Sequence, residues 1–180
     1  MYRLFVAIRL RPSMLDACLE AIADGPAGWA WQTGEQLHLT LRFIGEVEGP
    51  VAEDIAWALS LIQARPGEVA LNGVGLFDQG RRSVLFARVA PREPLAVLHA
   101  KIDRALVQLG LELERCSYFP HITLARRRHG AADPASWLER HAGLVTPPKQ
   151  AASFALYESH LTSHGPHYEA AGEYPLPTTQ

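Results

Sequence analysis

The feature that most constrains the fold is an internal repeat, in which the second half of the chain echoes the first at a nearly constant offset. The segment His38-Leu39-Thr40-Leu41 recurs as His121-Ile122-Thr123-Leu124, 83 residues later. Leu15 and Leu19 recur as Leu98 and Ile102 at the same offset, and Leu4-Phe5 recurs 81 residues later as Leu85-Phe86. Self-similarity at one period indicates duplication of a structural unit. We therefore predict a single two-lobed domain over residues 1–180, with approximate twofold symmetry and repeats at 2–80 and 83–176.

The apolar pattern predicts the same order of elements in both repeats. Apolar residues at helical spacing predict helices at 14–22, 51–62 and 95–109, and a shorter helix that opens at Asp133-Pro134. Strands are predicted at about 3–9, 37–44, 69–75, 84–89, 111–115, 121–126, 154–161 and 168–174. Trp29 and Trp31 are expected in an ordered loop. This alternation favours an α+β or a mixed α/β architecture.

Composition and charge exclude several classes of protein. With 17 Lys and Arg against 19 Asp and Glu, the formal net charge is −2, so no general field exists to coat DNA or long RNA, and a polyanion must meet a local patch. No stretch approaches the roughly 20 apolar residues of a membrane span, and the N-terminus lacks a signal-peptide cleavage site. Cys18 and Cys116 are far apart with no metal-type spacing. We expect a cytoplasmic protein, monomeric and without a membrane partner.

The His-x-Thr segments predict a paired polar site. Side chains alternate across a strand, so His38 and Thr40 share one face while the flanking leucines share the other. His121 and Thr123 repeat this arrangement. If the apolar faces point to the core, two imidazoles and two hydroxyls reach one cleft. One such segment alone would indicate polar residues on a solvated strand, but two in matched contexts favour a shared site.

Further histidines in the chain have other interpretations. A third triplet, His160-Leu161-Thr162, is followed by Ser163 and lies outside the 83-residue offset, so we interpret it as a coincidence. His160, His164 and His167 resemble a metal cluster in spacing only. Gly165-Pro166 indicates a turn, and no acidic or thiol ligand completes the set, which favours a solvated hairpin over a metal site.

Two histidines without a metal can still catalyse phosphodiester chemistry. The ordinary pKa of histidine is near ~6.5, so one imidazole can act as a base while the other acts as an acid. Threonine hydroxyls can donate hydrogen bonds to phosphate oxygens as charge develops. A strained cyclic phosphate suits such a pair, because its leaving oxygen is already held in place. We expect no cofactor and no metal.

Residues that follow the two triplets have ambiguous positions. Strict alternation places Arg126 opposite His121, so it reaches the cleft only if the strand ends or bulges after Leu124, and a position in the cleft and a surface position are equally favoured. Its neighbours Arg127, Arg128 and His129 supply local positive charge that could steer an RNA end. Arg42 is expected at the cleft rim or at an exposed strand end. Phe43, Tyr118 and Tyr157 are candidate platforms for a base, although core packing is favoured for Phe43.

The residues resemble a known family. The segments at 37–45 (LHLTLRFIG), 119–126 (FPHITLAR) and 156–159 (LYES) are similar to those of two-histidine phosphoesterases. Within that superfamily they are closest to the bacterial and archaeal RNA 2′,3′-cyclic phosphodiesterases, also called 2′-5′ RNA ligases (LigT or ThpR). The resemblance spans residues 5 to about 176. It implies a bilobal α+β fold in which antiparallel sheets line a central cleft and helices lie outside.

The resemblance also implies an activity and a role for each site residue. The reaction is metal-independent hydrolysis of a terminal RNA 2′,3′-cyclic phosphate to a 2′-phosphate, with reverse 2′-5′ ligation as an added capacity. His38 is then the proton donor to the leaving O3′, and His121 is the base that activates water. Thr40 and Thr123 orient the phosphate, and Arg126 contacts it. RNA ends, tRNA fragments among them, are the expected partners.

Three rival functions remain open from the sequence. An enzyme of the same superfamily could use a small cyclic nucleotide or a 2′-5′ oligonucleotide instead of an RNA end. A catalytically silent module that binds RNA ends is the rival of another class. Both triplets are intact, which counts against the silent module.

Overall fold

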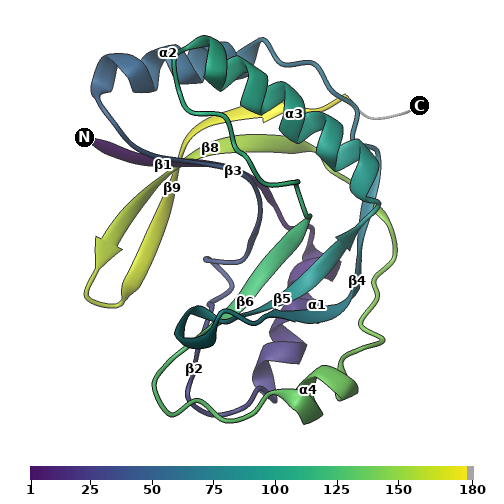
Figure 1. Ribbon diagram of the computed structural model, residues 1–180. Helices are drawn as coiled ribbons and strands as arrows, with labels where there is room; N and C mark the ends of the chain where they lie inside the picture. Colours follow the sequence, from purple (N-terminus) through teal and green to yellow (C-terminus); the bar gives the residue numbers. More distant parts are fainter. Residues whose placement is uncertain (178–180) are drawn as a thin grey trace.

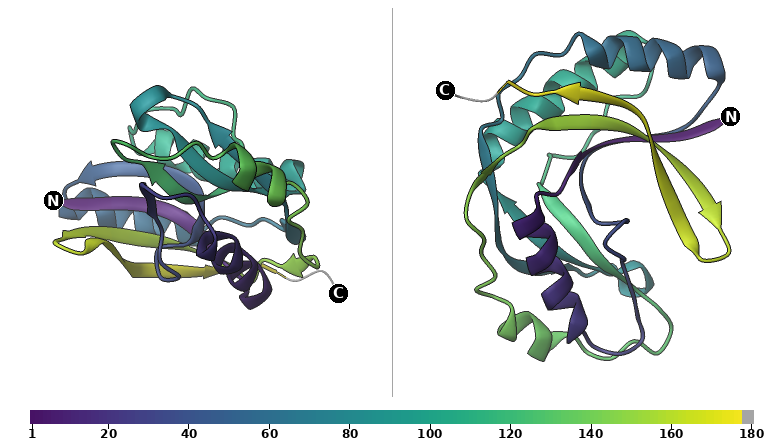
Figure 2. Two further views of the ribbon diagram at one scale, coloured as in Figure 1. Left: turned by 90° about the horizontal axis from the view of Figure 1, so that it is seen from below. Right: turned by 180° about the vertical axis from the view of Figure 1, so that it is seen from behind.

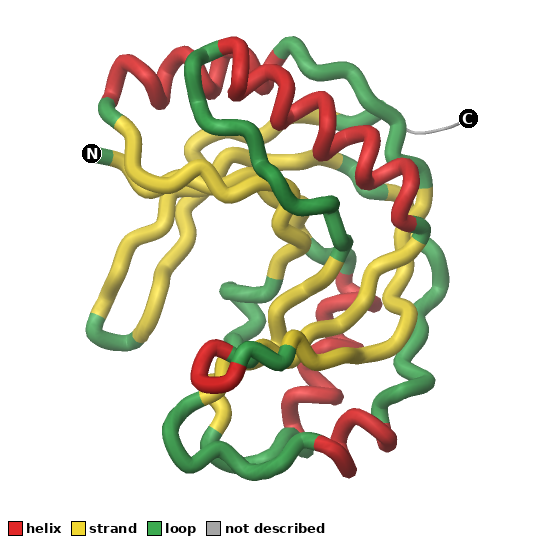
Figure 3. The backbone as a smooth tube through the Cα atoms, in the orientation of Figure 1, coloured by secondary structure: helices red, strands yellow, loops and turns green. Residues whose placement is uncertain are grey.

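Two antiparallel sheets frame the molecule, and their strands line its concave side (Figures 1 and 3). The computed structural model describes residues 1–177. One sheet has four strands in the order β3 (His38–Val47), β1 (Tyr2–Arg9), β8 (Ser153–Thr162) and β9 (Gly165–Pro175). The other has five, in the order β2 (Trp29–Trp31), β6 (His121–Arg127), β5 (Val84–Ala90), β4 (Glu68–Phe77) and β7 (Lys149–Gln150).

Helices lie outside the sheets, two beside each one (Figure 2). The four-stranded sheet is covered by α2 (Gly49–Ser60) and α3 (Arg92–Gln108), and the five-stranded sheet is flanked by α1 (Pro12–Ala23) and α4 (Ala135–Arg140). A short 3₁₀ helix, η1 (Gly80–Arg82), joins β4 to β5. The predicted α+β class, with antiparallel sheets around a cleft and helices outside, is confirmed.

Each sheet combines strands from both predicted repeats. In the four-stranded sheet, β1 and β3 come from the first repeat and β8 and β9 from the second. In the five-stranded sheet, β5 and β6 come from the second repeat, whereas β4 comes from the first. The helices also mix the two repeats, because α2 of the first repeat and α3 of the second cover the same sheet. A lobe therefore needs both halves of the chain, and the repeat boundaries at 2–80 and 83–176 stay a prediction about sequence.

The core forms as the alternation of the motif strands predicts. Leu39, Leu41, Ile122 and Leu124 are at most 1% exposed, whereas the intervening histidines and threonines are only partly buried. The four predicted helices are all present, and each buries apolar residues in this core, such as Met14, Ile55, Leu98 and Trp137. Burial of these side chains supplies the main favourable contribution to folding.

Two predicted segments differ from the structure. Residues 111–115 form no strand, because side chains take up their backbone groups: the Asp103 carboxylate accepts from the amide of Glu114, and Arg42 donates to the carbonyl of Glu112. Trp29 and Trp31 lie in strand β2 instead of a loop, because Trp29 pairs with Arg127 and Trp31 with Ala125. Both differences arise from partners distant in the sequence. Within residues 1–177, no helix combines the length and apolarity needed to cross a bilayer.

Candidate active site

The two His-x-Thr strands bring their polar residues to one cleft between the lobes. A cavity of about 640 Å³ is lined by His38 and Thr40 from β3 and by Thr123 and Arg126 from β6. His121 lies on the same face of β6, two residues before Thr123, and its positive charge lowers the pKa of the His38 imidazole. All five residues predicted for the site are thus in or beside one cleft.

Both motif histidines are held in the same way by a carbonyl two residues earlier. Nδ1 of His38 lies 2.7 Å from the carbonyl oxygen of Gln36, and Nδ1 of His121 lies 2.7 Å from that of Phe119. Because a carbonyl only accepts, Nδ1 carries the proton in both rings. In the neutral imidazole Nε2 is then free to accept a proton, and in the charged form it can donate one.

Burial and Arg126 together disfavour the charged forms of both imidazoles. Burial lowers the pKa of His38 to about 4, and the positive charges of Arg126 and His121 push the same way against the opposing Gln36 hydrogen bond. Burial also lowers the pKa of His121, again assisted by Arg126 and opposed by the Phe119 hydrogen bond. In the ligand-free protein both histidines are therefore neutral at pH 7.

An aromatic pair lies behind each histidine. The ring of His38 lies 4.8 Å from that of Phe5, which stacks on Tyr157 at 5.3 Å. The ring of His121 lies 5.6 Å from that of Phe86, and Phe86 stacks on Phe77 at 4.1 Å. Phe5 and Phe86 occupy equivalent positions in the repeat. These rings desolvate and orient the imidazoles.

A β-bulge after the second triplet places Arg126 at the cleft. Phe86 pairs with Thr123 and Leu85 pairs with Ala125, so Leu124 is an extra residue in β6. Leu124 and Ala125 are consequently both fully buried, and the alternation is reset by one residue. Arg126 then shares the face of His121 and Thr123. The condition on which its approach to the cleft depended is therefore met.

The equivalent bulge in β3 has the opposite effect on Arg42. Ala7 pairs with Thr40 and Val6 with Arg42, which leaves Leu41 as the extra residue. Arg42 therefore points to the helical side, where its Nε lies 2.8 Å from the buried Asp103 carboxylate of α3. It is at neither the cleft rim nor an exposed strand end, and both expectations for it were wrong.

The same bulge corrects the expectation for Phe43. The shifted alternation places it on the cleft face, where it is 56% exposed and lines the cavity with Thr40. Core packing was the wrong interpretation, and Phe43 is an exposed aromatic residue at the cleft. Tyr157, another candidate platform, is instead buried behind Phe5.

The third His-x-Thr triplet lies apart from the two motif strands, in the hairpin of β8 and β9. His160 pairs with His167 across this hairpin, and its Nε2 lies 3.6 Å from the carboxylates of Glu158 and Glu169. The predicted hairpin is confirmed, with its turn at Ser163-His164 instead of Gly165-Pro166. Among residues 1–177, no group of three His, Cys, Asp or Glu side chains is arranged to hold a metal ion.

Sequence reasoning missed Gln36 and Phe119 as residues that orient the histidines. They are 83 residues apart, so they occupy equivalent positions in the repeat. Because the backbone carbonyl accepts the hydrogen bond, the residue type at these positions differs and does not reveal the role. Gln36 also donates from Nε2 to the carbonyl of Pro166 at 2.9 Å. This hydrogen bond ties the β8–β9 hairpin to the segment before His38, and Tyr168 of that hairpin packs edge-on to the imidazole at 5.2 Å.

A bilobal α+β fold with two His-x-Thr strands on one cleft defines a two-histidine phosphoesterase. A family model described as the 2′-5′ RNA ligase superfamily matches residues 26–164, and the chain belongs to this family. The RNA 2′,3′-cyclic phosphodiesterase of Aeropyrum pernix is 32% identical over 143 residues, which cover 77% of this chain and 81% of the relative. That of Thermus thermophilus is 31% identical over 185 residues, covering 97% and 90%.

Solved structures have the same fold. A crystal structure of a Thermus thermophilus protein superposes with a TM-score of 0.76 and 26% identity, over 99% of this chain and 100% of that one. Escherichia coli LigT complexed with 3′-AMP gives a TM-score of 0.80 at 22% identity, over 97% of this chain and 98% of that one. The likeness to LigT therefore shows the same fold over nearly the whole chain.

Proposed function

We propose that this protein is an RNA 2′,3′-cyclic phosphodiesterase that hydrolyses a terminal cyclic phosphate to a 2′-phosphate. The observation that carries the proposal is the matched pair of imidazoles, His38 and His121, each with Nδ1 on a carbonyl and Nε2 free. Two such groups at one cleft form an acid and base pair for phosphodiester chemistry. The relatives named RNA 2′,3′-cyclic phosphodiesterase support this substrate class.

The proposed reaction moves one proton at each histidine. Nε2 of His121 takes a proton from water while the water oxygen attacks phosphorus. The bond from phosphorus to O3′ breaks, and the Nε2 proton of His38 passes to O3′, which leaves a 3′-hydroxyl and a 2′-phosphate. Thr40 and Thr123 donate hydrogen bonds to the non-bridging oxygens, where negative charge increases in the transition state.

Substrate binding favours the protonated form of His38 that this mechanism requires. The low pKa of His38 leaves it neutral in the ligand-free protein, yet a proton donor must be protonated. A bound cyclic phosphate is an anion, and an opposite charge within a few ångströms raises the pKa of a histidine. The anion also pairs with Arg126, whose positive charge otherwise disfavours protonation of both histidines. The bound substrate therefore favours protonation of His38, which then donates this proton to O3′.

Phe43 provides a surface for the terminal base in this scheme. It occupies the position in β3 that Arg126 occupies in β6, so the two side chains flank the same cavity. An exposed aromatic ring stacks on any base, because every base has a π face. We infer that recognition of the terminal nucleotide is tolerant of base identity.

Further parts of the proposal concern context. Ligation of 2′-5′ ends follows from microscopic reversibility, with a 5′-hydroxyl in the position of water. Ends of tRNA fragments are the proposed cellular substrates, and the proposed location is the cytoplasm, where thiols such as those of Cys18 and Cys116 stay reduced. We propose that the protein acts as a monomer, which analytical ultracentrifugation of the purified chain tests directly.

The deciding experiment incubates a short RNA that ends in a 2′,3′-cyclic phosphate with the protein in EDTA. We expect a 2′-phosphate product, separated chromatographically from the 3′-phosphate isomer. A 3′-phosphate alone, or loss of activity in EDTA, contradicts the mechanism. Turnover of a cyclic mononucleotide or a 2′-5′ oligonucleotide in preference to the RNA end favours those rival substrates. RNA binding without turnover of any of them identifies the silent module.

A further inference from the structure

Three exposed arginines lie beside the end of β6 that carries Arg126, and we call them the arginine rim: Arg81, Arg82 and Arg128. Arg81 and Arg82 belong to η1, and Arg128 directly follows β6. In a chain with a net charge of −2, such a cluster is a local departure from the average. Over the described residues 1–177, none of the three has an acidic side chain within ion-pair distance.

Backbone pairing brings the two parts of the rim together. The amide of Arg127 donates to the carbonyl of Ser83 at 2.9 Å, so Arg128 and Arg82 are neighbours across that contact. Figure 1 shows η1 at the open side of the five-stranded sheet, next to the end of β6. Arg127 itself turns to the other face, where its guanidinium lies over the Trp29 ring at 5.9 Å.

Two acidic residues that lie close to the rim in the sequence, Asp78 and Asp133, are engaged in local structure. The Asp78 carboxylate accepts from Oγ of Ser83 at 3.0 Å and from the amide of Gly80 at 3.3 Å. Asp133 accepts from the amide of Ala135 at the start of α4. These carboxylates do not neutralise the arginines by pairing with them. The rim is therefore an available site for anions.

The rim continues the direction set by the active-site cavity. Along β6 the polar residues run from His121 through Thr123 to Arg126, and the rim begins two residues later. A nucleotide whose phosphate lies at the histidines and whose base lies at Phe43 therefore occupies the part of the cleft next to the rim. The chain that precedes this nucleotide must leave the cleft, and its phosphates carry the charge that unpaired arginines attract.

A second route from the histidines exists but has fewer unengaged cations. A cavity of about 590 Å³ also borders His38 and extends to Arg9, Glu35 and His167. Arg9 is engaged by Tyr157, whose hydroxyl raises the pKa of the arginine. The Glu35 carboxylate, which lines the same cavity, repels phosphate. The arginine rim is the better match for an RNA backbone.

We propose that the arginine rim binds phosphates of the RNA chain upstream of the terminal nucleotide. The inference rests on the proposed function and adds to it a preference for oligonucleotides over cyclic mononucleotides. Because these contacts lie outside the reacting centre, they contribute to binding and not to the acid and base steps. Phosphate contacts do not distinguish one base from another, so the expected preference is for the length of the RNA and not for its sequence.

The test compares two substrates in one charge-reduced variant, Arg81→Gln/Arg82→Gln/Arg128→Gln. For a decamer RNA ending in a 2′,3′-cyclic phosphate, we expect kcat/KM to fall by about 10-fold or more, mainly through KM. The salt slope of log kcat/KM should become less steep by about 2, at about 0.7 for each lost single-strand contact. For 2′,3′-cyclic AMP, kcat/KM should stay unchanged.

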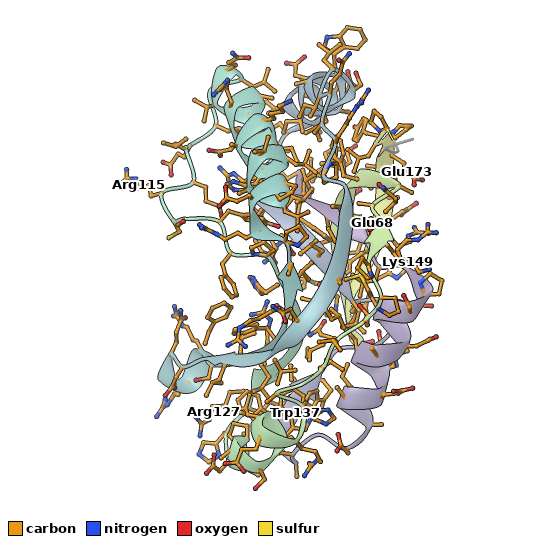
Figure 4. The ribbon with its side chains drawn as sticks, turned by 90° about the vertical axis from the view of Figure 1, so that its right-hand side faces the viewer. Glu68, Arg115, Arg127, Trp137, Lys149 and Glu173 are labelled. Carbon is orange, nitrogen blue, oxygen red and sulfur yellow. The ribbon has the colours of Figure 1, made fainter. Side chains whose placement is uncertain are left out.

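A matched control removes three exposed arginines from the other lobe, Arg65→Gln/Arg104→Gln/Arg115→Gln. The net charge change is identical, so equal losses in both variants would mean a general charge effect and overturn the proposal. Figure 4 shows how far Arg115 lies from the end of β6 marked by Arg127. A loss of kcat/KM for the decamer in Arg9→Gln but not in the rim variant would place the upstream RNA in the cavity lined by Arg9, and this result would also overturn the proposal.

A second measurement separates this inference from the proposed function. Equilibrium binding of a decamer that ends in a 2′-phosphate requires no turnover. If the wild-type protein hydrolyses neither substrate, the proposed function fails, while weaker decamer binding by the rim variant still supports the rim as an RNA site. If the rim variant binds the decamer as tightly as the wild type, the inference is wrong whatever the activity.

Discussion

The Tyr118 hydroxyl donates a hydrogen bond to the carbonyl oxygen of Thr40 at 2.9 Å, which joins the segment before one motif histidine to the strand of the other. The Tyr118 ring also stacks on His99 of α3, with centroids 4.5 Å apart and planes 9° from parallel. Burial raises the pKa of the Tyr118 phenol, so its hydroxyl stays a donor at ordinary pH. The next residue, Phe119, supplies the carbonyl that orients His121. Tyr118 therefore couples the positions of the two halves of the site.

Tyr118→Phe removes only the hydroxyl and keeps the stacked ring. We expect kcat to fall by roughly 3- to 10-fold with little change in KM, because a small misplacement of catalytic groups lowers the rate more than binding. Steady-state kinetics on the cyclic-phosphate RNA measure both constants. Tyr2→Phe, at an exposed tyrosine, is the control and should have no effect. A rise in KM alone would assign Tyr118 a role in binding instead.

Loss of either motif histidine should nearly abolish turnover. We expect His38→Ala and His121→Ala each to lower kcat by at least about 10²-fold, because each removes one member of the proposed acid and base pair. Circular dichroism should show an intact fold, since both rings face the cleft. His160→Ala removes the histidine of the third triplet and should retain activity. A loss in that variant as large as in the other two would place the reaction in the hairpin.

Anion binding should raise the pKa of both motif histidines. In the ligand-free protein the pKa of His38 is about 4 and that of His121 is also depressed, so both rings are neutral at pH 7. NMR titration of the imidazoles with and without inorganic phosphate measures the change. Correspondingly, the bell-shaped profile of kcat should lie at higher pH than that of kcat/KM, because kcat/KM reports the free enzyme.

The same titration isolates the contribution of Arg126. Its positive charge lowers the pKa of each histidine, so Arg126→Gln should raise both values in the ligand-free protein and move the kcat/KM profile to higher pH. Phosphate binding should weaken in this variant. Unchanged histidine pKa values would show that Arg126 points away from the site in solution.

The threonines should affect the height of the pH profile and not its limbs. Thr40→Ala and Thr123→Ala each remove a hydroxyl that, in the proposed mechanism, donates to phosphate oxygens but carries no proton. Loss of such a donor typically costs about 10²-fold or more in kcat when the donor acts on developing charge. Thr40→Ser and Thr123→Ser retain the hydroxyl and should recover much of the rate. A shift of either limb would indicate a direct influence on a histidine.

Arg42 should matter for stability because of its buried ion pair. Arg42→Met leaves the Asp103 carboxylate, only 8% exposed in its side chain, without its guanidinium partner. We expect the free energy of unfolding to fall by about 3 kcal/mol, the usual cost of an unpaired buried charge. Denaturant titration measures it. Arg104→Gln, at an exposed arginine on the same helix, should change it little. Adding Asp103→Leu to Arg42→Met should restore part of the loss, and failure to do so would point to lost packing.

Local sequence determined the four helices, most of the strands and the inward-facing residues of the motif strands. Apolar spacing predicted all four helices, and alternation separated His38 and Thr40 from Leu39 and Leu41, because side-chain direction in a regular strand depends only on position. The repeat then predicted that His121 and Thr123 would share the arrangement. These inferences needed no knowledge of which strand lies beside which.

Only the tertiary structure decided what depends on pairing between distant segments. The bulges at Leu41 and Leu124 arise from the register of β3 against β1 and of β6 against β5, and each reverses the side-chain direction of the residues that directly follow it. Arg126 and Phe43 reach the cleft, and Arg42 turns to Asp103, for this single reason. The exchange of β4 and β8 between the lobes has the same origin. The sequence determined the residues of the site, and long-range pairing determined the directions in which they point.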